Sequence, residues 1–161
     1  MIRTLSSVPL RIAGSEDFDF LARVYASTRT EELAPVPWPD DLKSAFLRSQ
    51  FEAQDKYYRE NYTTAEFLVI LDGEMPAGRL YVDRWPDEIR LMDIALLPEH
   101  RGKGIGTRLL RDLQDEARAV GKPLRIHVER MNPALELYKR LGFLQVEDRG
   151  VYWLMEWRHD G

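Results

Sequence analysis

The chain has 161 residues, of which 44% are hydrophobic and 31% charged, and this composition suits one soluble domain with a substantial core. Its formal net charge of −4 argues against a nucleic-acid partner, which requires a basic face. The absence of cysteine excludes disulfides, thiolate metal sites and an acyl-cysteine intermediate, and the three histidines are not spaced as a pair of metal ligands.

Neither a signal peptide nor a membrane span is expected. The first ten residues lack the apolar core of a signal peptide, and no run approaches the roughly 20 apolar residues of a transmembrane helix. We therefore expect a soluble cytoplasmic protein without a membrane partner. The composition leaves the oligomeric state open, a homodimer included.

The first part of the chain predicts one strand and two helices. Residues 9–13 favour a strand, and a helix follows over the apolar positions 18–25. Residues 29–39 contain three prolines, which remove backbone donors, so we expect this segment not to be helical. Asp40 or Asp41 is then expected to cap a long helix.

The remainder of the chain predicts mainly strands. They are expected over 66–71, 77–83, 88–97, 124–129, 143–147 and 151–157, with helices over 107–120 and 133–141. Asp72-Gly73 is typical of a hairpin turn. The order β-α-α-β-β-β-α-β-α-β-β indicates an α/β (α+β) fold, with a mixed central sheet of about seven strands and helices on both faces. No linker divides residues 1–161, so we expect one domain.

Residues 98–107, Pro-Glu-His-Arg-Gly-Lys-Gly-Ile-Gly-Thr, lie between an apolar strand end and an amphipathic helix. Glycines let the backbone approach a ligand, and the free N–H groups and dipole at a helix start favour an anion. A Walker loop is excluded because Lys103 is followed by Gly104. A dinucleotide fingerprint is excluded because Gly106 comes one position early. The remaining pattern is Arg101-x-x-Gly104-x-Gly106.

This pattern resembles the pyrophosphate loop of the GCN5-related N-acetyltransferases, the GNAT superfamily, whose fold has the same order of elements. Residues 132–143, Asn-Pro-Ala-Leu-Glu-Leu-Tyr-Lys-Arg-Leu-Gly-Phe, resemble the family's helix after the fifth strand. Asn132 and Tyr138 are six steps apart, whereas many relatives have seven. The resemblance implies a GNAT fold and an enzyme that moves the acetyl group of acetyl-CoA, its co-substrate, directly to a primary amine. The acceptor would be a small molecule or an exposed protein or peptide amine, and no metal is expected.

The resemblance also implies where coenzyme A binds. The backbone of residues 94–96 would pair with the pantetheine arm like an added strand. The glycine-rich loop would hold the pyrophosphate. The implied contact residues are Ile94, Ala95, Leu96, Arg101, Gly102, Lys103, Gly104, Ile105, Gly106, Thr107, Asn132 and Tyr138.

Tyr138 is the residue that the resemblance implies as the general acid, protonating the departing thiolate. The apolar spacing of its helix also fits a core aromatic residue. A ring that is buried in part and keeps its hydroxyl at a wet edge satisfies both interpretations.

The general base has three candidates. His127 occupies the position of a glutamate that acts as base in relatives that acetylate protein N-termini, and its alternative is a structural histidine packed beneath a helix. Asp93 and Glu88 are rivals, since other members use a carboxylate on that strand. If Asp93 is not the base, its expected partner is a loop N–H group or Arg90.

The acceptor site is expected from residues 26–62 and the final hairpin. Its aromatic side chains can form a cage for a cation, with packing along the long helix as the alternative for each. The candidates are Glu31, Glu32, Trp38, Tyr57, Tyr58 and Tyr62. Two other functions stay open, an acyl-CoA-binding sensor without turnover and a transferase that uses a longer acyl-CoA or acylates a hydroxyl.

Overall fold

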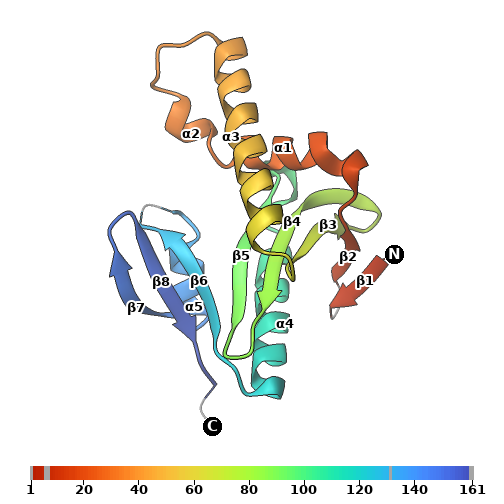
Figure 1. The fold of residues 1–161 in the computed structure, drawn as a ribbon, viewed down its shortest axis with the longest axis vertical. Helices are drawn as coiled ribbons and strands as arrows, with labels where there is room; N and C mark the ends of the chain where they lie inside the picture. The colour runs from red at the N-terminus through yellow and green to blue at the C-terminus, as the bar shows by residue number, and fades with distance from the viewer. Residues whose placement is uncertain (1, 6–7, 131, 160–161) are drawn as a thin grey trace.

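The fold is built around one mixed sheet, seen in a computed structural model that describes residues 2–5, 8–130 and 132–159. The sheet has eight strands in the order β1-β2-β3-β4-β5-β6-β8-β7, and β5 with β6 is the parallel pair among them. The predicted seven strands are confirmed, and an additional strand at the N-terminus pairs with the first of them. This is the α/β arrangement that the sequence predicted (Figure 1).

The element bounds follow the predicted ones closely. The strands are β1 Ile2–Leu5, β2 Val8–Ile12, β3 Glu66–Asp72, β4 Met75–Arg84, β5 Ile89–Leu96, β6 Leu124–Glu129, β7 Leu144–Arg149 and β8 Tyr152–Trp157. The helices are α1 Phe18–Ser27, α2 Thr30–Leu33, α3 Asp40–Asn61, α4 Ile105–Val120 and α5 Leu135–Arg140, with 3₁₀ turns at Ser15–Asp17 and Pro98–His100.

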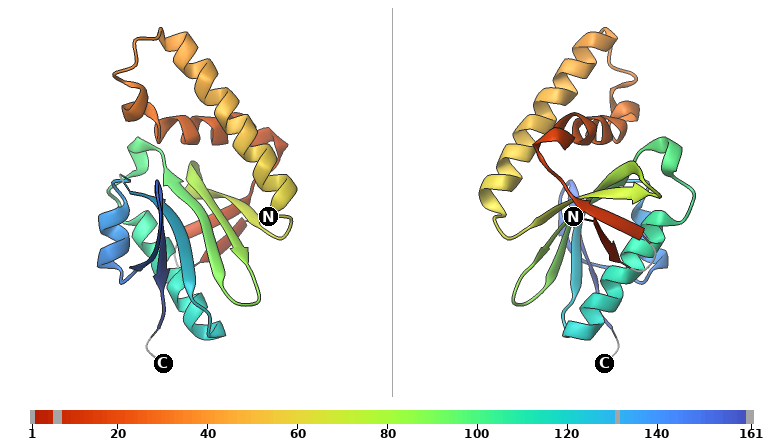
Figure 2. Two further views of the ribbon diagram at one scale, coloured as in Figure 1. Left: turned by 60° about the vertical axis from the view of Figure 1, so that its left-hand side comes forward. Right: turned by 90° about the vertical axis from the view of Figure 1, so that its right-hand side faces the viewer.

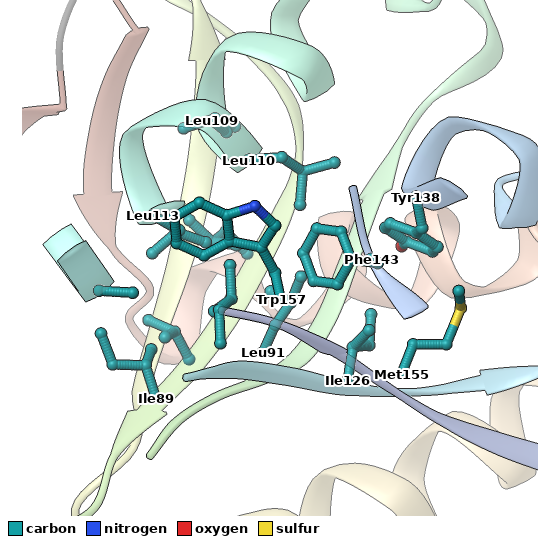
Figure 3. Close-up of a cluster of buried hydrophobic side chains, with 14 of the residues drawn as sticks. Ile89, Leu91, Leu109, Leu110, Leu113, Ile126, Tyr138, Phe143, Met155 and Trp157 are labelled. Atoms are coloured by element: carbon teal, nitrogen blue, oxygen red, sulfur yellow. The ribbon is translucent and has the colours of Figure 1, made fainter. Parts of the chain in front are cut away.

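Helices cover both faces of the sheet and give it two hydrophobic cores. Helices α1 and α3 lie on one face and α4 on the other, as the turned views show (Figure 2). The larger core, on the α4 and α5 side, includes Leu91, Leu109, Ile126, Tyr138 and Phe143 (Figure 3). The smaller core joins α1 and α3 to β3 and includes Leu21, Tyr25, Leu47, Phe51 and Val69.

The prediction that residues 29–39 contain no helix is wrong, because α2 forms over Thr30–Leu33. The prolines at 35, 37 and 39 all lie beyond this turn. The donors within the turn are therefore intact, and the Ala34 N–H donates to the Thr30 carbonyl at 3.0 Å. The proline argument applies only to the segment that leads into α3.

Helix starts and turns differ from the predictions by one or two residues. Helix α3 begins at Asp40, so both predicted capping aspartates lie in its first turn, where the dipole favours them. The hairpin loop between β3 and β4 is Gly73-Glu74 rather than Asp72-Gly73, because Asp72 pairs with Met75. Helix α4 begins at Ile105, two residues before the predicted start.

Strands β5 and β6 lie side by side at one end and diverge toward the other (Figure 1). Their pairing ends at Leu91 and Ile126. Opposite β4, Met92 is an extra residue in the register of β5, a bulge that bends a strand away from its neighbour. The second half of β5 is therefore paired on one side, with β4, and its other edge faces the opening between the strands.

Candidate active site

A cleft of about 1050 Å³ occupies the opening between β5 and β6. One end is formed by the glycine-rich loop and the start of α4. The other end lies under the arm made by α1, α2 and α3, and α5 and the β7–β8 hairpin supply the remaining wall. The cleft therefore joins the predicted coenzyme loop to the predicted acceptor region.

The glycine-rich loop has the conformation that an anion-binding loop requires. Gly102 and Gly104 have φ values of 78° and 81°, a region that residues with a Cβ rarely adopt. Helix α4 starts directly after Gly104, so the first N–H groups of the helix lack intrahelical acceptors. Arg101, Gly102, Gly104, Ile105, Gly106 and Thr107 all line the cleft.

Polar contacts hold this loop in place. The Arg101 Nε donates to the Leu96 carbonyl at 2.9 Å, which ties the loop to the end of β5. Oδ2 of Asp72 contacts both Lys103 Nζ, at 2.8 Å, and His100 Nδ1, at 2.9 Å. Lys103 and His100, in that order, hold the pKa of the Asp72 carboxyl below its usual range. Lys103, predicted to contact the coenzyme, thus directs its ammonium to the β3–β4 hairpin.

The other predicted coenzyme residues lie along the same cleft. Ile94, Ala95 and Leu96 line it from the open edge of β5, where an extended ligand can add as a strand. Asn132 also lines it, and its side chain accepts the Ala134 N–H at 2.8 Å, just before α5 begins. The structure thus brings these predicted residues together in one cleft.

Tyr138 is both a core residue and a cleft residue. Its ring lies edge-on to that of Phe143 in the larger core (Figure 3), with ring centroids 5.7 Å apart. The residue is 3% exposed, and it also lines the cleft. Burial, and after it the charge of Asp93, raise the pKa of the Tyr138 hydroxyl. The hydroxyl therefore keeps its proton at neutral pH and can donate it.

His127 lines the cleft, but arginines occupy both of its ring nitrogens. Arg90 contacts Nδ1 at 3.2 Å and Arg149 contacts Nε2 at 3.0 Å. Desolvation by burial, followed by Arg90 and Arg149, lowers the pKa of His127. A neutral imidazole has one acceptor nitrogen and a guanidinium only donates, so the accepting lone pair is already occupied. As predicted, Ile126 and Val128 are buried on the opposite face of the strand.

The two rival carboxylates have different surroundings. Glu88 is 4% exposed and is held by Arg90 at 2.7 Å and Arg125 at 2.9 Å, behind the cleft wall. Asp93 lines the cleft with 29% of its side chain exposed, and its partner is the buried Arg79 rather than Arg90. Of the two, Asp93 is placed to meet a ligand.

The predicted acceptor residues are only partly brought together. Glu31, Glu32, Tyr58 and Tyr62 line the cleft. Burial and then Asp93 raise the pKa of Tyr58 to about 12. Trp38 instead packs edge-on against Phe46 with ring centroids 5.4 Å apart.

Several residues of the acceptor end carried no signal in the sequence. Arg29, at the start of α2, bonds Glu129, at the end of β6, at 2.9 Å across 100 positions of chain. Tyr25, Gln54, Arg79, Arg149 and Tyr152 also line this end. Each belongs to an otherwise ordinary strand or helix pattern, so only the fold reveals the grouping.

Within residues 2–5, 8–130 and 132–159, no three His, Asp or Glu side chains are grouped so that they could hold a metal ion. Over the same residues, none of the helices is both long enough and apolar enough to cross a membrane.

Comparison with known sequences matches a family model and a curated relative. The acetyltransferase (GNAT) family model matches residues 28–143. The streptothricin acetyltransferase of Streptomyces lavendulae is 43% identical over 110 residues, which are 66% of this chain and 54% of that protein. The chain thus spans about half the length of this curated relative.

Solved structures share the fold over nearly the whole chain. The PaiA N-acetyltransferase of Thermoplasma acidophilum, in complex with coenzyme A, has a TM-score of 0.72 at 19% identity, covering 95% of this chain and 99% of that one. A Salmonella typhimurium acetyltransferase that modifies the N-terminal serine of ribosomal protein L7/L12 has a TM-score of 0.65 at 16% identity, covering 99% and 100%.

Proposed function

The chain belongs to the acetyltransferase (GNAT) family, and on that basis we propose that it transfers the acetyl group of acetyl-CoA directly to a primary amine. One observation carries the proposal. A single cleft joins a loop built to bind an anion to a buried tyrosine and an accessible carboxylate, Tyr138 and Asp93. These are the groups that acetyl transfer requires.

The coenzyme would bind along β5 and the start of α4. The N–H groups from Gly102 to Thr107 would hold the pyrophosphate, since they are free of intrahelical partners and lie at the positive end of the helix dipole. The open edge of β5 would pair with the pantetheine arm. The thioester would then lie between Tyr138 and Asp93.

In the proposed reaction the amine nitrogen bonds the acetyl carbon while the carbon–sulfur bond breaks. The nitrogen loses a proton to the Asp93 carboxylate, directly or through water, and the proton passes on to solvent. The departing thiolate takes a proton from the Tyr138 hydroxyl, which solvent restores. The products are the amide and free coenzyme A.

We favour Asp93 over His127 as the group that accepts the proton. Both ring nitrogens of His127 already contact guanidiniums, so neither is open to an entering amine. Asp93 also has a guanidinium partner, Arg79, but pairs with it through Oδ2. Asp93 keeps part of its side chain exposed in the cleft.

The acceptor amine would enter beneath α2 and α3, past Tyr58, Tyr62 and Glu31. Streptothricin is the first acceptor to test, because the relative from Streptomyces lavendulae carries that name. A peptide with an N-terminal serine is the second, after the Salmonella typhimurium structure.

The test is release of free thiol from acetyl-CoA on a panel of these amines, with mass spectrometry of the acceptor. We expect thiol release that depends on one amine and equals the amide formed. Coenzyme binding without release on any amine would replace this proposal by an acyl-CoA sensor. Release with a longer acyl-CoA but not with acetyl-CoA would change the donor.

A further inference from the structure

Arg79 is a charged residue that is almost completely buried. It lies in the middle of β4, on the face covered by α1 and α3, and is 3% exposed. Burying a charge is costly, and a buried ion pair is often no more stabilising than an apolar pair of similar size. Stability alone is therefore a weak reason for a guanidinium at this position, and none of the steps proposed above uses it.

The contacts of Arg79 come from two different parts of the molecule. Its Nη2 atom pairs with Asp93 Oδ2 on β5 and donates to Gln54 Oε1 on α3 at 3.1 Å. Its guanidinium carbon lies 4.8 Å from the ring centroid of Tyr81 and 5.9 Å from that of Phe51. Arg79 thus connects the reacting strand to the arm that forms the acceptor end.

Strand register explains how the two charges meet. Arg79 is paired with Ala95, and Tyr81 is paired with Asp93, so Arg79 and Asp93 are diagonal neighbours on one face of the sheet. Long side chains reach across such diagonals. The bulge at Met92 lies directly before Asp93 on the same strand.

The two sides of the Asp93 side chain have different surroundings. Oδ2, which faces Arg79, is inaccessible to solvent, whereas the side chain as a whole is 29% exposed. The exposed area therefore belongs to the rest of the side chain. With Oδ2 fixed, a carboxylate that would otherwise rotate presents its other oxygen in one direction.

We propose that Arg79 is a positioning residue for acetyl transfer: by holding Oδ2 of Asp93 it directs the second carboxylate oxygen toward the entering amine. The inference rests on the proposed function and on the role given there to Asp93. The Asp93 carboxylate that Arg79 positions also acts on two neighbouring tyrosines. After burial, its negative charge is the next cause of the raised pKa values of Tyr138 and Tyr58.

A double-mutant cycle separates positioning from a purely structural role. Arg79→Met, Asp93→Asn and the double variant are compared with the unaltered chain, together with Arg79→Lys. Arg84→Met is the matched control, because Arg84 lies on the same strand and pairs with Glu66 and Glu116 away from the cleft. Each variant is measured for coenzyme A affinity by calorimetry, for thermal unfolding, and for kcat/KM with the amine.

We expect Arg79→Met to lower kcat/KM for the amine by about 10- to 100-fold, the scale on which a misplaced catalytic group costs rate. Coenzyme A affinity should stay within about 3-fold, because the coenzyme loop does not touch Arg79, and Arg79→Lys should recover part of the loss. In the Asp93→Asn background, Arg79→Met should have no further effect, because there is no carboxylate left to position.

Three results would overturn the inference. Arg79→Met could turn over like the unaltered chain. It could lower kcat/KM as much in the Asp93→Asn background as in the unaltered one. Arg84→Met could cause the same loss. If Arg79→Met does not fold, the double variant, which leaves no unpaired charge, decides the question by comparison with Asp93→Asn. Absence of transfer by the unaltered chain would instead refute the proposed function.

Discussion

The coenzyme end and the acceptor end of the cleft are built in different ways. The coenzyme end is formed mainly by one continuous segment, the glycine-rich loop and the start of α4, from which residues 101, 102 and 104–107 line the cleft. The acceptor end consists of side chains from α1, α2, α3 and the last strands, among them Arg29 and Glu129, which bond across 100 positions of chain. We therefore expect the first end to bind its ligand through the backbone and the second through side chains that the fold brings together.

This difference explains what the sequence could predict. Backbone recognition requires glycines at set positions, and Gly102 and Gly104 do have the positive φ values that require them. The spacing of apolar residues and the turn residues between segments likewise predicted the seven strands. The acceptor end leaves no such pattern, because Arg79 and Tyr152 look like ordinary strand residues until the sheet brings them together.

The same contrast holds for individual predictions. Tyr138 was predicted from a local helical motif, and it lines the cleft as expected. The partner of Asp93 was not predictable, because its pairing with Arg79 depends on the register of β4 against β5. His127 was correctly placed in the cleft, but the two arginines that surround it come from β5 and β7.

Asp93→Asn tests the acceptor end and has the largest expected effect. It should lower kcat by about 100-fold, at the low end for a group that accepts a proton, while leaving coenzyme A affinity unchanged. His127→Gln is the matched change on the facing strand and should retain most activity. A larger loss for His127→Gln than for Asp93→Asn would reverse the assignment of the base.

Tyr138→Phe tests the point where the two ends meet. Loss of the proton donor should lower turnover by at least ~10-fold, with little change in coenzyme affinity. Tyr57→Phe, on the exposed side of α3, serves as the control. Turnover equal to that of the unaltered chain would remove Tyr138 from the chemistry and leave it a core residue.

Gly104→Ala tests the coenzyme end. A Cβ at this positive φ strains the loop, so coenzyme A affinity should fall by about 10-fold. Gly150→Ala is the control, since Gly150 has a φ of 80° in the β7–β8 turn, and its variant should lose stability without losing affinity. Equal affinities in the two variants would show that the loop does not hold the coenzyme.

Asp72→Asn tests whether the loop is held in place from outside. Lys103 and His100 would lose their shared charged partner, so coenzyme A affinity should fall by about 3-fold, as suits partly exposed ion pairs. The loss should shrink at high salt. Glu74→Gln, on the same hairpin, should have no effect, and a similar loss there would point to a general charge effect.

His127 should leave a small signature in the pH dependence of stability. Its pKa is lowered in the folded chain, so between that value and about 6.5 the unfolded chain binds a proton that the folded chain does not. Stability is therefore lost as the pH falls below about 6.5. His127→Gln should show a smaller decrease of Tm between neutral pH and about pH 5, and an identical decrease would contradict the lowered pKa.

A structure of the protein with coenzyme A bound tests the central claim most directly. We predict the pyrophosphate on the N–H groups from Gly102 to Thr107, the pantetheine arm along the open edge of β5, and the sulfur between the Tyr138 hydroxyl and the Asp93 carboxylate. A coenzyme bound elsewhere, or a sulfur that points away from both side chains, would contradict the account.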